Sequence, residues 1–170
     1  MREVSNEVLR SFLEGKGTDD RGRTLDEILR CDDHWLEHNH DFIQWLFPID
    51  TPSGANPNAP IVSARLAKEL GAMTEVAGNL RRAVCRMAAF YGFAVVNAGL
   101  QGAADYRVRA PRWAAHPTHN DLRITRILRS LTLFGLSKEA RSFYEAAIAA
   151  VREFRADASV DRYWAMALTA

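Results

Sequence analysis

Cysteine is scarce in this sequence, because its 170 residues include only Cys31 and Cys85. The two lie far apart, with no CxxC motif or His/Cys cluster around either, which excludes a disulfide framework and a redox motif. We therefore expect a reduced, cytoplasmic setting. The N-terminal segment MREVSNEV also lacks an apolar run, so we expect no signal peptide.

Long apolar runs are lacking as well. Residues 87–104 carry no charged side chain, but the stretch is interrupted by Gly92, Asn97, Gly99, Gln101 and Gly102. A helix that spans a bilayer needs about 20 consecutive, mostly apolar residues. We therefore predict no membrane span and interpret the stretch as the end of a core helix followed by a turn or strand.

No charge of one sign dominates, since 22 Lys and Arg residues face 21 Asp and Glu residues, for a net charge of +1. This balance argues against a strongly basic nucleic-acid binder. The distribution is uneven, however: residues 1–60 carry 12 acids and 6 bases (−6), and residues 61–170 carry 9 acids and 16 bases (+7). The two halves could pair their charges, or the second half could present a basic face to an anionic partner.

The composition, with 48% hydrophobic and 25% charged residues, is that of a globular protein rather than a disordered one. Capping residues and helical periodicity recur along the chain, and no βαβ alternation is present. We predict an all-α fold: a compact single domain over residues 1–170, built as a bundle of seven or eight helices. One small β-hairpin could form between residues 93–96 and 106–109. Residues 111–117 are expected to be a loop, and Ser137 is expected to cap a helix.

A helix is predicted over residues 32–47, between the capping residue Asp32 and Pro48. His40 falls in its apolar arc, which is typical of a core histidine that hydrogen-bonds a neighbour. Trp45 falls among polar side chains instead. Either another element covers this tryptophan or it serves a ligand.

The same segment contains HWLEH, which matches the H-x-x-E-H signature of inverted zinc peptidases through His34, Glu37 and His38. That chemistry needs a third protein ligand, for which Glu69 and Glu75 are options that no motif marks. The other interpretation is a solvated His/Glu face. We assign no metal ligand, cofactor or catalytic residue to the chain.

A second informative helix is predicted over residues 120–134. His119, Arg123, Arg126 and Ser130 form a stripe along the edge of its apolar side. Guanidinium groups at the border of a core need acceptors, because an unpaired buried charge is costly. The acceptors could be Asp41 and Glu37, or a carboxylate or phosphate on a ligand, which suits the arginine fork.

Four segments resemble the conserved domain of the opioid growth factor receptor family. They are TLDEILRCDDHWLEHNH (24–40), HDFIQWLFP (40–48) with the loop that ends in NAP (58–60), RMAAFYGF (86–93) and HNDLRITRILRSLTLFGL (119–136). The resemblance covers roughly residues 20–150 and implies a helical domain. For animal members it also implies binding of a short opioid peptide, restraint of cell proliferation and a perinuclear or nuclear location. It implies no catalytic residues.

We therefore expect a non-enzymatic, receptor-like binding domain whose ligand is a short peptide or a small carboxylate. In its site Trp45 stacks on the ligand and two arginines hold a carboxylate, while three polar residues orient it; the full set is Asp41, Gln44, Trp45, His119, Arg123 and Arg126. Two alternatives stay open. One is a hydrolase that uses His38 or His119 with a carboxylate, with or without zinc. The other is a protein- or nucleic-acid-interaction module that uses the basic second half.

Overall fold

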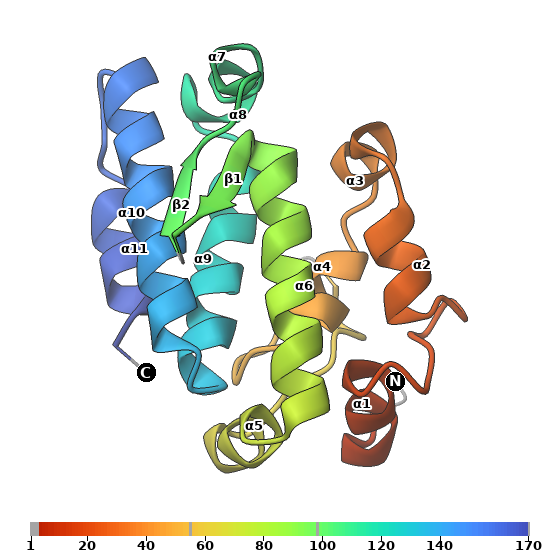
Figure 1. Cartoon of the computed structure of the whole chain (residues 1–170). Coiled ribbons are helices and arrows are strands. Elements are labelled where there is room, and N and C mark those ends of the chain that lie inside the picture. The colour runs from red at the N-terminus through yellow and green to blue at the C-terminus, as the bar shows by residue number, and fades with distance from the viewer. Residues whose placement is uncertain (1–3, 55, 98, 170) are drawn as a thin grey trace. The chain divides into compact units, whose positions relative to one another are not determined.

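The computed structural model of the chain describes residues 4–54, 56–97 and 99–169, which fall into two compact units. The first unit comprises Met1–Ala83 and Leu133–Gly135, and the second comprises Val84–Thr132 and Leu136–Ala170. Figure 1 labels the elements of both. The expectation of one domain over residues 1–170 stays a prediction.

The first unit is built from short helices that begin at capping side chains. They are α1 (Asn6–Leu13), α2 (Leu25–Arg30), α3 (Asp33–His38), α4 (Phe42–Leu46), α5 (Ala64–Gly71) and the first part of α6 (Thr74–Tyr91). The side chains of Ser5, Thr24, Asp32 and Ser63 each accept a hydrogen bond from a backbone N–H of the first turn. These bonds satisfy amides that a helix start leaves without partners, so the local sequence determines where each helix begins.

The core of the first unit is aromatic and centres on α4. Trp45 is 1% exposed, and its ring packs edge-on against Phe12 of α1 at a centroid distance of 5.3 Å. The Asn79 side-chain amide donates to the Leu13 carbonyl at 2.9 Å and thereby joins α6 to the end of α1. The turn at residues 133–135 belongs to this unit, and the backbone of Phe134 contacts Gly71 at the end of α5.

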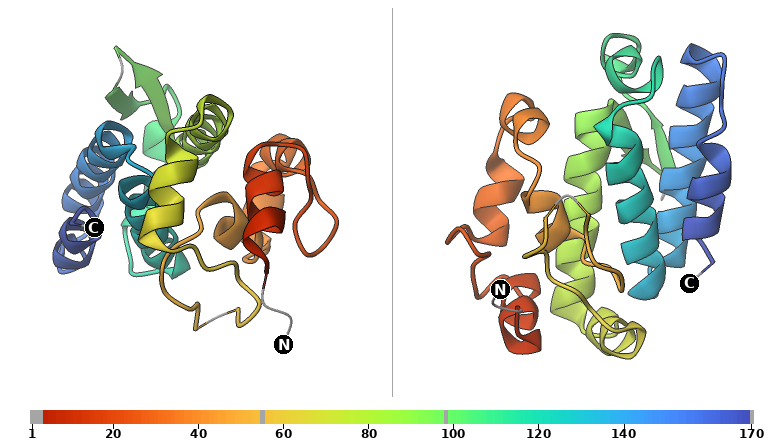
Figure 2. Two further views of the ribbon diagram at one scale, coloured as in Figure 1. Left: turned by 90° about the horizontal axis from the view of Figure 1, so that it is seen from below. Right: turned by 180° about the vertical axis from the view of Figure 1, so that it is seen from behind.

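The second unit combines a hairpin with the longer helices. It contains β1 (Phe93–Val96), β2 (Gly99–Gly102), α7 (Tyr106–Arg109), α8 (Pro111–Ala114), α9 (His119–Leu133), α10 (Ser137–Phe154) and α11 (Asp161–Ala167). The strands are antiparallel, with Phe93 opposite Gly102. Strand β2 lies along α10, where the Ser142 hydroxyl accepts the Leu100 N–H at 2.9 Å. Figures 1 and 2 show α10 and α11 side by side, and Tyr144 donates to Asp161 between them at 2.6 Å.

The all-α class with one small hairpin is confirmed. The described residues form more helices than the seven or eight expected, because segments of four to six residues close into separate helical turns. None of the helices in the described ranges is long and apolar enough to cross a bilayer.

The single helix predicted over residues 32–47 is wrong, because α3 ends at His38 and α4 begins at Phe42. Asn39 adopts an extended conformation, and both its backbone N–H and its side-chain amide donate to the Trp35 carbonyl. An asparagine that competes in this way for backbone acceptors ends a helix. His40 lies in the break and is exposed, so the expectation of a core histidine is also wrong.

The partner predicted for the first strand is wrong too. The chain turns back directly after Val96, with Asn97 at φ 49°, a left-handed conformation that asparagine tolerates in tight hairpins. Residues 106–109 form helix α7 instead of a strand. Residues 111–114, expected in a loop, form α8 with Pro111 in its first turn, a position that proline suits. Ser137 makes no capping hydrogen bond, since Leu136 occupies the N-cap position of α10.

Candidate functional site

The six residues predicted to form a site are divided between the two units. Asp41, Gln44 and Trp45 belong to the first unit, and His119, Arg123 and Arg126 belong to the second. The prediction that all six share one site therefore stays a prediction.

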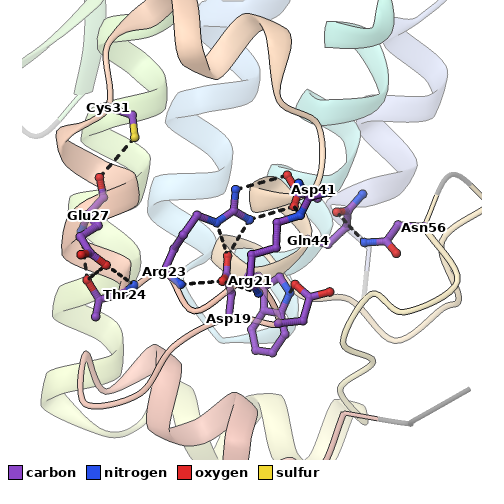
Figure 3. Close-up of polar contacts among 11 residues, drawn as sticks. Asp19, Arg21, Arg23, Thr24, Glu27, Cys31, Asp41, Gln44 and Asn56 are labelled. Atoms are coloured by element: carbon purple, nitrogen blue, oxygen red, sulfur yellow. Dashed lines mark hydrogen bonds and ion pairs between the residues drawn. The ribbon is translucent and has the colours of Figure 1, made fainter.

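Asp41 is part of a charged cluster at the start of α4 (Figure 3). Arg23 lies between two carboxylates: its Nε donates to Asp19 Oδ2 at 2.6 Å, and its NH2 donates to Asp41 Oδ2 at 2.9 Å. The Arg21 Nε is 2.5 Å from the same Asp41 oxygen. Burial alone would lower the pKa of Arg23, but the hydrogen bonds to both carboxylates raise it above its usual value. The arginines and aspartates of this cluster therefore pair with one another.

Asp19 anchors this cluster and is 5% exposed. Its Oδ1 accepts the backbone N–H groups of Arg21 and Arg23, both at 2.9 Å, which is the pattern of an Asx turn. None of Asp19, Arg21 and Arg23 was predicted to belong to a site. The sequence does contain a turn signal there, because Asp19 is followed three residues later by a glycine. In the structure this glycine, Gly22, has a positive φ of 77°.

Trp45 and Gln44 are both buried in the first unit. The Trp45 Nε1 donates to Asp20 Oδ1 at 3.0 Å, and α1 covers the ring through Phe12. Of the two interpretations of this tryptophan, the geometry favours coverage by another element. The Asn56 side-chain amide donates to Gln44 Oε1 at 3.4 Å, which ties the Asn/Pro loop to α4 (Figure 3).

In the second unit, Arg123 and Arg126 lie on α9 in different environments. Arg123 is 4% exposed, and its NH1 donates to Asn120 Oδ1 at 3.3 Å, an oxygen that also accepts the Tyr91 hydroxyl at 3.1 Å. Arg126 is half-buried, and burial lowers its pKa to about 10. It still carries its charge at neutral pH, in surroundings where an anion would interact strongly with it. His119 is the exposed first residue of α9.

Arg155, at the end of α10, is the main polar link of the second unit, and sequence reasoning missed it. Its guanidinium donates to the carbonyls of Ala114 and His116 at 2.9 and 2.7 Å, and to both carboxylate oxygens of Asp121. These bonds join α10 to the end of α8 and the start of α9. No sequence motif marks an arginine that follows the last apolar residues of a helix, so the sequence alone could not predict this role of Arg155.

The HWLEH residues lie on α3, where His34 and His38 are exposed and their rings stack at a centroid distance of 4.2 Å. Glu69, one option for a third zinc ligand, forms an ion pair with Arg65 at 3.8 Å. Across the described ranges, no three His, Cys, Asp or Glu side chains gather in a way that could hold a metal ion. The geometry therefore does not assemble the three-ligand centre of a zinc peptidase.

Comparison with known proteins gives a consistent picture. Residues 17–167 match the family described as the opioid growth factor receptor (OGFr) conserved region. The chain is 39% identical over 124 residues to the opioid growth factor receptor of Rattus norvegicus, a match that covers 68% of this chain and 20% of the rat protein.

Two further relatives extend the comparison. The human opioid growth factor receptor is 39% identical over 106 residues, covering 59% of this chain and 15% of that protein. The opioid growth factor receptor-like protein 1 of Xenopus tropicalis is 34% identical over 119 residues, covering 67% and 23%. The chain thus spans about a fifth of the length of these relatives. No solved structure matches it.

Proposed function

Because the chain belongs to the opioid growth factor receptor conserved-region family, we propose that it is a non-enzymatic, receptor-like binding domain for a short peptide or a small carboxylate ligand. The observation that carries this proposal is the match over residues 17–167, together with relatives that are themselves named receptors. The matched region contains all six residues proposed for the site.

Burial divides these six residues into two roles. Gln44, Trp45 and Arg123 are buried and bonded to neighbours in their own units, so they act by positioning. Asp41 is half-buried and paired with Arg21 and Arg23 in the first unit, so it also acts by positioning. The ligand contacts are assigned to the second unit, where Arg126 is half-buried and His119 is exposed.

Arg126 is the residue to which we assign the ligand carboxylate. A guanidinium offers two parallel N–H donors to a carboxylate, and such charge-assisted bonds are stronger than neutral ones. Burial has already removed much of the water around Arg126, and this burial lowers its pKa. An arriving carboxylate therefore replaces little solvent and gains a strong interaction in return.

The decisive experiment compares an opioid pentapeptide that has a free C-terminal carboxylate with its C-terminal amide, by calorimetric titration. A hydrogen bond to a charged group contributes about 1.5–3 kcal/mol, so the amide should bind about 10- to 100-fold more weakly. In Arg126→Gln the acid and amide forms should bind equally. His116→Ala, which alters an exposed side chain elsewhere in the second unit, should keep the wild-type preference.

Two outcomes would contradict this proposal. If wild-type protein binds neither peptide form, the ligand class is wrong. If it prefers the acid but Arg126→Gln keeps that preference while folding normally by circular dichroism, another group holds the carboxylate.

A further inference from the structure

We propose that His34 and His38 form a two-histidine binding site for a late transition-metal ion, most tightly Cu²⁺, on the exposed face of α3. The two residues are part of HWLEH and play no part in the proposed receptor function. Metal binding at these two histidines therefore does not depend on that function.

The first support is the spacing of the two imidazoles. His34 and His38 are four residues apart on α3, which places both rings on one face of the helix. Their centroids are 4.2 Å apart, the ring planes differ by 28°, and both side chains are exposed to solvent. An ion arriving from solvent can therefore reach both rings at once.

The second support is the state of the His38 ring. Its Nδ1 lies 2.8 Å from the His34 carbonyl oxygen. A carbonyl oxygen can only accept, so in this hydrogen bond Nδ1 carries the proton and Nε2 of the neutral ring keeps its lone pair. Metal-binding histidines usually donate their second ring N–H in this way, which sets the tautomer and the orientation of the ligating nitrogen.

The His34 ring can then adjust to the ion. Within the described residues the His34 ring stacks on His38 and makes no hydrogen bond that fixes its rotation. The proposed site requires the His34 ring to turn about its side-chain torsions, so that one of its nitrogens and the Nε2 of His38 face the same ion.

The donor set indicates the class of ion. Imidazole nitrogens suit Zn²⁺, Ni²⁺ and Cu²⁺, and affinities for a given site rise to a maximum at Cu²⁺. No three-ligand group exists in the part of the chain that the structure describes, so water or a small anion completes the coordination. The first unit carries 14 acids and 10 bases in its sequence, a net charge of −4 that favours a cation.

Calorimetric titration of the untagged full chain with CuCl₂ and with ZnCl₂ tests the site. Wild-type protein should bind Cu²⁺ more tightly than Zn²⁺. His34→Ala and His38→Ala should each weaken Cu²⁺ binding by at least about tenfold, since even the loss of an outer-shell partner has an effect of that size. His116→Ala, which removes an exposed histidine of the second unit, should bind like wild type. Circular dichroism checks that each variant folds.

A second variant separates geometry from the number of histidines. Asp33→His combined with His34→Ala keeps two histidines on α3 but sets them five positions apart, on different faces of the helix. It should bind as weakly as His34→Ala. In NMR spectra of wild-type protein, a trace of paramagnetic Cu²⁺ should broaden the ring signals of His34 and His38 before those of other histidines.

Either of two results would overturn the site. One is equal Cu²⁺ affinity in wild type, His34→Ala and His38→Ala. The other is wild-type affinity in the double variant, because binding would then not depend on the one-turn spacing.

Discussion

Gly71 shows how one missing side chain can shape a unit. It ends α5, and a β-carbon built there would overlap the backbone carbonyl of Phe134. Gly78, in α6, has open space where a β-carbon would stand, since no atom from outside its own stretch of helix lies within 4 Å of that position. The close approach of the Phe134 backbone therefore requires a glycine at position 71, whereas nothing at position 78 excludes a side chain.

We expect Gly71→Ala to destabilise the protein by about 1–3 kcal/mol, because the backbone at Phe134 must move to admit the methyl group. Gly78→Ala should instead stabilise it by about 0.5–1 kcal/mol, since alanine loses less backbone freedom in a helix. Urea denaturation of the two variants measures both values. Equal effects would show that the contact between residues 71 and 134 does not limit packing.

Ionisation of Tyr106 makes the free energy of unfolding depend on pH in the alkaline range. Burial, followed by the hydrogen bond it donates to Glu153 at 3.0 Å and the charge of that carboxylate, raises the pKa of Tyr106 to about 12. The folded state therefore binds this proton more tightly than the unfolded chain, whose tyrosine has a pKa near 10. The contribution is complete below about pH 10 and is lost as the pH rises towards 12.

The free energy of unfolding, measured across that range, should consequently fall more steeply in wild-type protein than in Tyr106→Phe. The phenylalanine variant has no proton to lose at this position. If both proteins lose stability in parallel, the hydroxyl is not perturbed in the folded state.

Among the elements, α2 has a complete start signal. Thr24 Oγ1 accepts the Glu27 N–H at 3.2 Å, and a Glu27 carboxylate oxygen accepts the Thr24 N–H at 2.7 Å, which forms a reciprocal capping box. At α10, by contrast, the Ser137 side chain caps nothing.

Thr24→Ala should therefore lower the free energy of unfolding by about 1 kcal/mol. Ser137→Ala should change it by less than about 0.5 kcal/mol, as is usual for an exposed residue with no capping bond. Chemical denaturation of both variants provides the comparison. A larger loss at Ser137 would mean that its hydroxyl does cap α10 in solution.

Sequence reasoning succeeded where the signal was local. Asp32 predicted a helix start that the structure confirms, since its side chain accepts the Trp35 N–H. It failed where a side chain competed with the helix backbone, as Asn39 does between α3 and α4. Short hairpins were equally hard to place, because Gly99–Gly102 has almost no side-chain signal of its own.

The candidate site was harder to predict than the helices. Asp41 was proposed for it, but the arginines that pair with Asp41 were not predicted, because they lie far away in sequence. Arg23 reaches Asp41 across 18 positions, and Arg155 reaches Asp121 across 34. Periodicity reports on neighbours one or two turns away and contains no information about such pairs.

At the scale of the whole molecule, the chain leaves the first unit after Ala83 and returns to it at Leu133–Gly135. Phe134 is 2% exposed in this returning turn, while Phe143 of α10 is fully buried in the second unit. Two phenylalanines nine positions apart thus belong to different units.

Phe134→Ala and Phe143→Ala should each lower stability by about 3–5 kcal/mol, the usual effect of removing a buried phenylalanine ring. Hydrogen exchange should separate them. Phe134→Ala should accelerate exchange most in α5 and the start of α6, whereas Phe143→Ala should do so most in α10 and the hairpin. Identical exchange patterns would show that the chain opens only as a single cooperative block.

The return of residues 133–135 also has a consequence for synthesis. A ribosome releases the chain from its N-terminus, so the first 83 residues emerge well before the turn that completes their unit. Until Gly135 has left the exit tunnel, the end of α5 around Gly71 has no Phe134 backbone to pack against. The end of α5 therefore stays without this contact while about 50 further residues are added, which takes roughly 3–10 s at ordinary elongation rates.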